Sequence, residues 1–197
     1  MQKPHELLIE NFLKAYPKRI RDFLRKDIIF SKEKRFVRKE CVEGSYDLET
    51  RQVILWNPTQ NEEDFFIVLT HEWGHKFYHE WLSEKQRSEW LKIRSRENID
   101  FDLKNSYSVF QIPEEEYCTV FSLISLVLYW RKIKMKKKSH KLHQKIKQEF
   151  PEAAKTVEQH IHTKPANHSS LAHSPDRNIT RREVEVLKNW IRQAIQE

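Results

Sequence analysis

The order of apolar and polar positions predicts helices at the start of the chain and strands after them. Residues 5–26 carry apolar side chains at helical spacing, interrupted at Pro17, so we expect two short helices there. The apolar positions then follow strand spacing, which predicts strands over 35–42 and 52–56. Gly44 lies in the connection between these strands, where we expect a turn with a positive φ.

Two apolar helices are predicted in the middle of the chain. Asn61 can cap the first helix, and its positions 65–77 are mostly apolar on every side, so this helix should be buried. A polar helix is expected over 83–96, and residues 97–112 look irregular. The second apolar helix is expected over 113–135.

The remainder of the chain is predicted to be helical on both sides of a linker. Helices are expected over 140–162 and 180–196. Thr180 is followed three residues later by Glu183, which is a capping box. Between the two helices, 163–178 contains two prolines and several Ser, His and Asn residues, a composition typical of a linker.

The positive charge of the chain is concentrated in one segment. The formal net charge is +7, but Arg131–Lys147 contains nine basic residues and no acid, and the rest holds 27 basic and 29 acidic residues. Such a segment is either a solvated helix end or a weak contact for nucleic acid or an anionic surface. We therefore expect a domain over 1–135, with its core over about 35–135, and a basic helical extension over 136–197.

The composition excludes several classes of protein. Cys41 and Cys118 are the only cysteines, which excludes a disulfide framework and a zinc site made of cysteines alone. The longest apolar-rich stretch, Val120–Trp130, is too short to span a bilayer, so we expect no membrane insertion. The first residues include acids where a signal peptide would have an apolar run, and we expect a cytoplasmic location.

Candidate chemistry lies in the first apolar helix, which contains an H-E-x-x-H motif. His71 and His75 are four residues apart and share a helix face, so both imidazoles can reach one metal ion. Glu72 flanks that face and is placed to accept a proton from water that the metal activates. Gly74 is costly inside a helix, which indicates that another element approaches closely behind it.

A catalytic zinc needs a third protein ligand. The candidates are His79, one of Glu114, Glu115 and Glu116, and a histidine of the C-terminal region. His79 lies about 12 Å along the helix from His71, so we expect it to support the ligands or to pack. The acidic triplet opens a helix that becomes apolar at once, so one of its carboxylates can point inward.

Residues 71–75 together with 113–121 resemble the gluzincins, the zincin-type metallopeptidases whose third ligand is a glutamate. The sequence H-E-W-G-H is followed by P-E-E-E-Y-C-T-V-F, and 81–90 is similar to the intervening helix of small bacterial and phage-borne members. The same arrangement occurs in the catalytic domain of anthrax lethal factor. The resemblance covers about residues 35–130.

This resemblance implies an α+β, zincin-like fold and a zinc-dependent peptidase. A small twisted sheet would pack on the helix of the H-E-x-x-H motif, and a second helix carrying the glutamate would cross behind it. Zn²⁺ would be held by His71, His75 and Glu115, with Glu72 as general base and a protein or peptide as substrate. An edge strand of the sheet would align the substrate, and we expect 52–56 to be that strand.

The sequence departs from the family pattern at two positions. Tyr107 falls near the tyrosine that stabilises the oxyanion in the family, but it lies one residue further from Glu115 than expected. Either one residue is inserted or Glu114 is the ligand, and the fit of the residues after the triplet favours Glu115. Thr119 stands where the family usually has an acid that supports a ligand histidine.

Two other functions therefore remain open at the level of the sequence. Thr119 would fit a catalytically weak or inactive zinc-binding domain with a regulatory or interaction role. The segment Arg131–Lys147 would fit a nucleic-acid-associated protein. Cys118 occupies a small-residue position in an apolar helix, so we expect it to pack rather than to act as a nucleophile.

Overall fold

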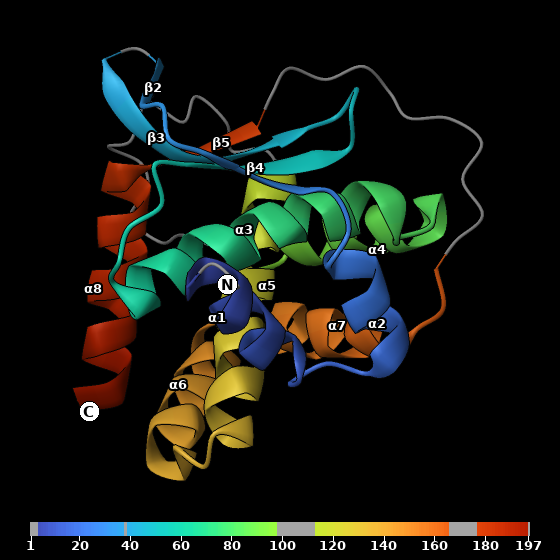
Figure 1. Ribbon diagram of the computed structural model, residues 1–197. Coiled ribbons are helices and arrows are strands. Elements are labelled where there is room, and N and C mark those ends of the chain that lie inside the picture. The colour runs from blue at the N-terminus through green and yellow to red at the C-terminus, as the bar shows by residue number, and fades with distance from the viewer. Residues whose placement is uncertain (1–3, 38, 98–112, 166–176, 197) are drawn as a thin grey trace.

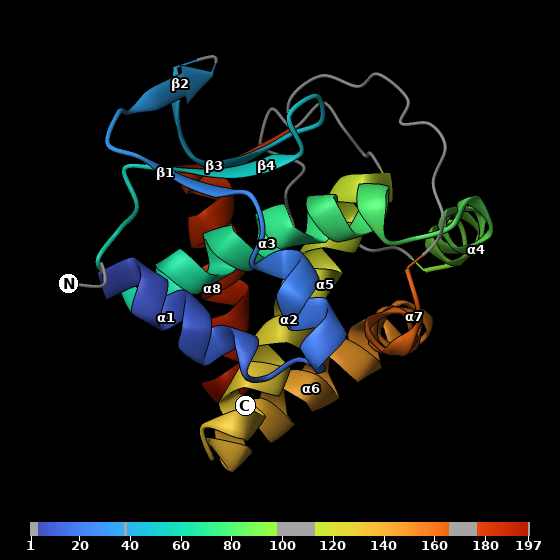
Figure 2. The same ribbon diagram turned by 45° about the vertical axis from the view of Figure 1, so that its right-hand side comes forward.

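The protein has an α+β fold in which a small mixed sheet covers a set of helices (Figures 1 and 2). The computed structural model describes residues 4–37, 39–97, 113–165 and 177–196. The helices of this part are α1 (Pro4–Leu13), α2 (Lys18–Leu24), α3 (Glu62–Glu80), α4 (Glu84–Arg94), α5 (Pro113–Lys132), α6 (Lys136–Glu149), α7 (Pro151–His162) and α8 (Arg181–Gln196). Its strands are β1 (Ile28–Ser31), β2 (Arg35–Val37), β3 (Glu40–Asp47), β4 (Gln52–Trp56) and β5 (Arg177–Thr180).

Local signals explain where several helices begin. The side chain of Asn61 accepts a hydrogen bond from the Asp64 amide at 3.0 Å, as expected for the cap of α3. At α8, the Thr180 amide donates to Glu183 Oε2 at 2.7 Å, which confirms the capping-box contact. The helix predicted over 140–162 is in fact two helices, because Pro151 starts α7 and cannot continue the hydrogen bonding of α6.

The sheet differs from the prediction in its order. Strand β4 pairs with β1 in parallel and with β3 antiparallel, so 52–56 is an inner strand. The expectation that these residues form a substrate-aligning edge was therefore wrong, since β4 is already paired on both sides. The single strand predicted over 35–42 is in fact β2 and the start of β3, which pair with each other antiparallel. Strands β1 and β5 were not predicted, and β5 pairs antiparallel with β3, on the side opposite β4.

Gly44 is not in a turn. Strand β3 continues through it to Asp47, and Gly44 does not have a positive φ. A Cβ at Gly44 would lie 2.7 Å from Val68 Cγ1 and 2.8 Å from Glu72 Cγ, both on α3. The glycine is thus explained by the close approach of the sheet to α3, and the predicted turn was wrong.

Helix α3 lies between the sheet and α5, and this layering positions the candidate site (Figure 1). Buried side chains of α6, α7 and α8 belong to the same hydrophobic core as those of α1 to α5. A boundary at residue 135 stays a prediction, and the shared core argues against a stable fragment that ends there. None of the described helices is long and apolar enough to cross a membrane.

Candidate metal centre

Three side chains from two helices converge at the side of α3 that faces α5. His71 and His75 are buried on α3, and Glu115 comes from the first turn of α5. One potential ligand atom from each residue can be chosen so that all three lie within 4.8 Å of one another. The structure therefore brings together the three residues that the sequence marked as metal ligands.

The geometry of this cluster fits a small divalent cation. Glu115 Oε2 lies 3.1 Å from His71 Nε2 and 3.5 Å from His75 Nε2. Ligand atoms of a tetrahedral zinc site are separated by about 3.3 Å, given bonds of about 2.0–2.1 Å. His75 Nε2 is buried and has no hydrogen-bond partner among the described residues, so a cation would satisfy it. Burial opposes ionisation of Glu115, but His75 and His71 hold its pKa below the usual range, as a ligand carboxylate requires.

Glu114 contacts the ring nitrogen of His75 that faces away from the cluster. Its Oε1 accepts hydrogen bonds from His75 Nδ1 and from His79 Nε2, each at 2.7 Å. A metal ligand histidine needs such an acceptor for its second ring nitrogen. Thr119, which stands at the position where the resemblance implies an acid, has a buried hydroxyl without a partner in the described part of the chain. The acid is therefore present at Glu114, five residues earlier in the chain than the resemblance implies.

The positions of Glu114 and His79 bear on which residue is the third ligand. Glu114 contacts the outer nitrogen of His75, whereas Glu115 faces the inner nitrogens of His71 and His75. Glu115 is thus the carboxylate that faces both candidate ligand nitrogens. His79 contacts Glu114 and lies outside the three-residue cluster, in line with a supporting role.

Gly74 of the H-E-x-x-H motif lies where another element approaches α3 closely, as predicted. A Cβ at Gly74 would lie 2.7 Å from Cys118 Cα and 2.9 Å from Cys118 Cβ, so α5 crosses α3 at that point. Cys118 is fully buried, and burial raises the pKa of its thiol to about 12. A thiol with such a pKa is not a nucleophile at neutral pH, which agrees with a packing role.

Glu72 lies on the side of α3 that faces the sheet. It is 0% exposed, and its Oε1 accepts a hydrogen bond from the Ile179 amide of β5 at 3.3 Å. Its Oε2 has no hydrogen-bond partner in the described residues. Burial is the main cause that raises the pKa of Glu72 to about 8. A general base works best when its pKa lies near the working pH, so this carboxylate suits that role.

Helix α4 holds the start of α5 in place. Glu116, the third acid of the triplet, forms an ion pair with Arg94, and Trp90 Nε1 donates to the Pro113 carbonyl at 2.5 Å. The three consecutive acids therefore make different contacts, with Glu114 and Glu115 meeting opposite nitrogens of His75 and Glu116 pairing with Arg94. The sequence alone could not distinguish these contacts. Tyr107, the expected oxyanion ligand, lies outside the described residues.

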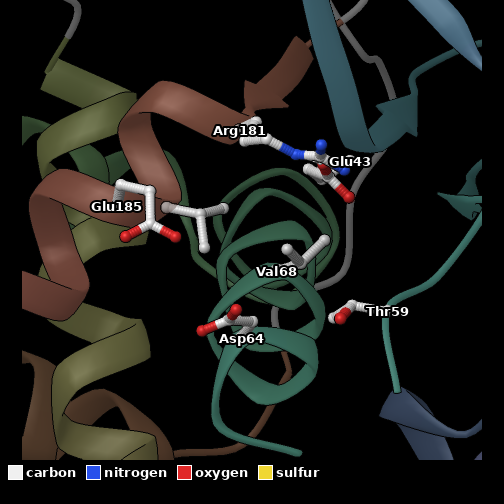
Figure 3. Close-up of a pocket in the computed structure, with 7 residues that line it drawn as sticks. Glu43, Thr59, Asp64, Val68, Arg181 and Glu185 are labelled. Carbon is white, nitrogen blue, oxygen red and sulfur yellow. Dashed lines mark hydrogen bonds and ion pairs between the residues drawn. The ribbon is translucent and has the colours of Figure 1, made fainter. Parts of the chain in front are cut away.

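A pocket lies beside Glu72's helix but does not include the cluster (Figure 3). It is lined by Glu43, Thr59, Asp64, Val68, Arg181, Val184 and Glu185. Arg181 Nε lies 2.6 Å from Glu43 Oε1, and Figure 3 shows these side chains pointing toward each other. This ion pair ties the start of α8 to β3, directly after β5.

No family model matches the chain, and neither a curated protein nor a solved structure matches it.

Proposed function

We propose that the protein is a zinc-dependent metallopeptidase with a zincin-like fold of the gluzincin type. The observation that carries the proposal is the convergence of His71 Nε2, His75 Nε2 and Glu115 Oε2. The buried carboxylate of Glu72 is near enough that the charges of His75 and Glu115 act on its pKa. Two imidazoles and one carboxylate are the ligand set of several catalytic zinc sites, which leave a position open for water or substrate. The proposal keeps the cytoplasmic location expected from the sequence.

The chain's own residues account for the proton transfers of peptide hydrolysis. A bound zinc would polarise the scissile carbonyl and acidify water. Glu72 accepts the proton of the attacking water and passes it to the leaving amine, which its raised pKa favours. Glu114 keeps His75 oriented, and Tyr107 would bind the developing oxyanion.

The contact of Glu114 favours an enzyme over a catalytically inactive zinc-binding domain. The argument for an inactive domain was that Thr119 leaves a ligand histidine without an acidic partner. Glu114 supplies that partner to His75, whereas His71 Nδ1 is buried and has no hydrogen-bond partner among the described residues. One of the two ligand histidines therefore has an acidic partner without an acid at position 119.

The substitution Glu72→Gln tests the proposal. Glutamine keeps the shape of the side chain but cannot accept the proton, so casein hydrolysis should fall by about 10²- to 10⁴-fold while zinc stays bound. Glu63→Gln is the matched control, because Glu63 lies on the same helix and pairs with Lys138 at the surface. Equal hydrolysis by the wild type and Glu72→Gln would contradict the proposal, as would a zinc-loaded wild type that hydrolyses no peptide of a broad library.

A second candidate function, contact with an anionic lipid surface, is favoured by the turn between α5 and α6. Three basic residues of the segment Arg131–Lys147 are engaged, since Lys138, Lys145 and Lys147 pair with acids. The cations exposed without an acidic partner in the described residues are Arg131, Lys132, Lys134, Lys136 and Lys137. Ile133 and Met135 stand between them, 43% and 44% exposed. Apolar side chains among cations suit lipid headgroups better than they suit nucleic acid.

Co-sedimentation with phosphatidylserine vesicles tests this second candidate. We expect salt-sensitive binding that Lys134→Glu and Ile133→Ser each weaken, since one removes charge and the other removes apolar contact. If Ile133→Ser leaves binding unchanged and the protein binds duplex DNA as strongly as it binds vesicles, nucleic acid would be favoured instead. Absence of both interactions would leave this turn as a solvated helix end.

A further inference from the structure

The C-terminal strand β5 lies against the carboxylate of the candidate base. Its Ile179 pairs with Gly44 of β3, and the Ile179 amide donates to Glu72 Oε1. Gly44 itself lies against Glu72 from the sheet, since a Cβ there would be 3.0 Å from Glu72 Oε1. Glu72 is therefore enclosed by β3 on one side and by β5 beside it, and it has no exposed surface.

A peptide that reacts at this centre must place its scissile carbonyl between the metal cluster and Glu72. The neighbouring edge of β3 offers main-chain groups to an extended peptide, which would add to the sheet as one more strand. That edge is occupied by β5, which runs antiparallel to β3 over Arg177–Thr180. The chain thus holds its own segment where an extended substrate would pair.

Of the two strands around Glu72, β5 is the one that can leave. Strand β3 lies inside the sheet with β4 paired to it, so its removal would disrupt the core. Strand β5 is four residues long and pairs with β3 alone among the described strands. It is held by the Ile179 side chain, which is 1% exposed and belongs to the core, and at its C-terminal end by the ion pair of Arg181 with the buried Glu43 (Figure 3). Short edge strands of this kind open at a lower free energy than inner strands do.

We propose that β5 is a displaceable internal strand that closes the site, and that an extended polypeptide substrate takes its place on β3. The role of the substrate in this proposal rests on the proposed peptidase function. Detachment of β5 exposes Glu72 and frees Oε1 from the Ile179 amide. The intact chain is then self-inhibited, and substrate competes with its own C-terminal segment.

A disulfide between β3 and β5 tests the proposal. Ser45 and Asn178 are cross-strand partners, and they alternate with Gly44 and Ile179, so they face away from Glu72. The variant Ser45→Cys/Asn178→Cys, made with Cys41→Ser to prevent mispairing, can close a bond of ordinary geometry. The matched control is Ile29→Cys/Ile54→Cys, which joins the paired strands β1 and β4.

Two measurements are made on the zinc-loaded full chain, oxidised and reduced. The first is casein hydrolysis, which we expect oxidation of the β3–β5 variant to lower by at least about tenfold and reduction to restore. The control should hydrolyse equally in both states. The second is hydrogen exchange, in which the Ile179 amide should exchange at least about 100-fold faster than the Leu55 amide of β4 in the reduced protein. Oxidation should slow exchange at Ile179.

These outcomes separate the strand proposal from the peptidase proposal. Equal hydrolysis in the oxidised and reduced states would overturn the strand proposal, because peptide would then reach Glu72 with β5 in place. If neither state hydrolyses any peptide, the peptidase proposal has failed, and hydrogen exchange alone tests the strand proposal. Exchange of the Ile179 amide that is fast in the reduced protein and slowed by the disulfide supports a displaceable β5. Exchange as slow as that of Leu55 overturns it.

Discussion

Helix α3 is in close contact with its neighbours on two sides, and a glycine marks each contact. At Gly74 the neighbour is backbone, because a Cβ would lie 2.7 Å from Cys118 Cα of α5. At Gly44 the neighbours are side chains of α3 itself, Val68 and Glu72. A backbone cannot yield, whereas side chains can rotate. The α5 side is therefore the rigid side, which holds the candidate ligands, and the sheet side is the adjustable one, which holds the candidate base.

The largest expected effect concerns the two neighbouring acids on the α5 side. Glu115→Ala removes a carboxylate that faces both ligand histidines, so it should abolish tight zinc binding. Glu114→Ala removes only the partner of His75 Nδ1 and should weaken zinc binding by about 10- to 100-fold. Zinc titration with a competing chelator measures both. A larger loss in Glu114→Ala than in Glu115→Ala would move the ligand by one residue.

Gly74→Ala should have the next largest effect. The added methyl group meets the backbone of α5, so α5 must shift and carry Glu115 away from the histidines. We expect a loss of about 1–3 kcal/mol in the free energy of unfolding, together with weaker zinc binding. Urea unfolding and the same zinc titration measure the two effects. Unchanged zinc affinity would contradict the rigid contact between α3 and α5.

Gly44→Ala should sharpen the contrast because it acts on the other side of α3. The methyl group displaces the Glu72 side chain but leaves the ligands in place, so hydrolysis should fall about 10-fold or more while zinc affinity is kept. The loss of stability should be smaller than for Gly74→Ala. Measuring casein hydrolysis and zinc affinity on the same preparation checks this, and a parallel loss of both would remove the distinction between the two sides.

The smallest predicted effect is the pH dependence of stability at His160, far from the sheet side of α3. Burial lowers the pKa of His160 to about 4, and the Tyr117 hydroxyl lies 3.3 Å from its Nδ1. The unfolded chain binds this proton from about pH 6.5 downward, so stability present above that pH is lost as the pH falls toward 4. The loss should not exceed about 3 kcal/mol. Urea unfolding of the wild type and His160→Gln between these pH values should show a steeper loss of stability in the wild type than in His160→Gln.

Local signals made much of the helical framework predictable. Asn61 and Thr180 each form the cap that the sequence predicts. The H-E-x-x-H spacing brought His71 and His75 to one face, and Gly74 indicated the crossing of α5. These features depend on residues within one or two helical turns, so the sequence alone specifies them.

The features that were missed depend on pairing between distant segments. Strands β1 and β5 are four residues each and form only because β4 and β3 offer edges to them. The sequence predicts a turn at Gly44, because the residues of β3 do not show how closely α3 packs against the strand. Glu114 can accept a hydrogen bond from His75 only at one rotation of α5 about its axis. Three consecutive acids in the sequence do not determine that rotation.

The ligand set that we propose is His71, His75 and Glu115 around one zinc ion. Its most direct test is the zinc content of purified, dialysed protein, measured by elemental analysis on the wild type, His75→Ala and His79→Ala. His79 is the matched control, because it lies one turn further along α3 and contacts Glu114 instead of facing Glu115. We expect about one zinc per chain in the wild type and in His79→Ala, and none in His75→Ala. Zinc retained in full by His75→Ala, or absent from the wild type, would contradict it.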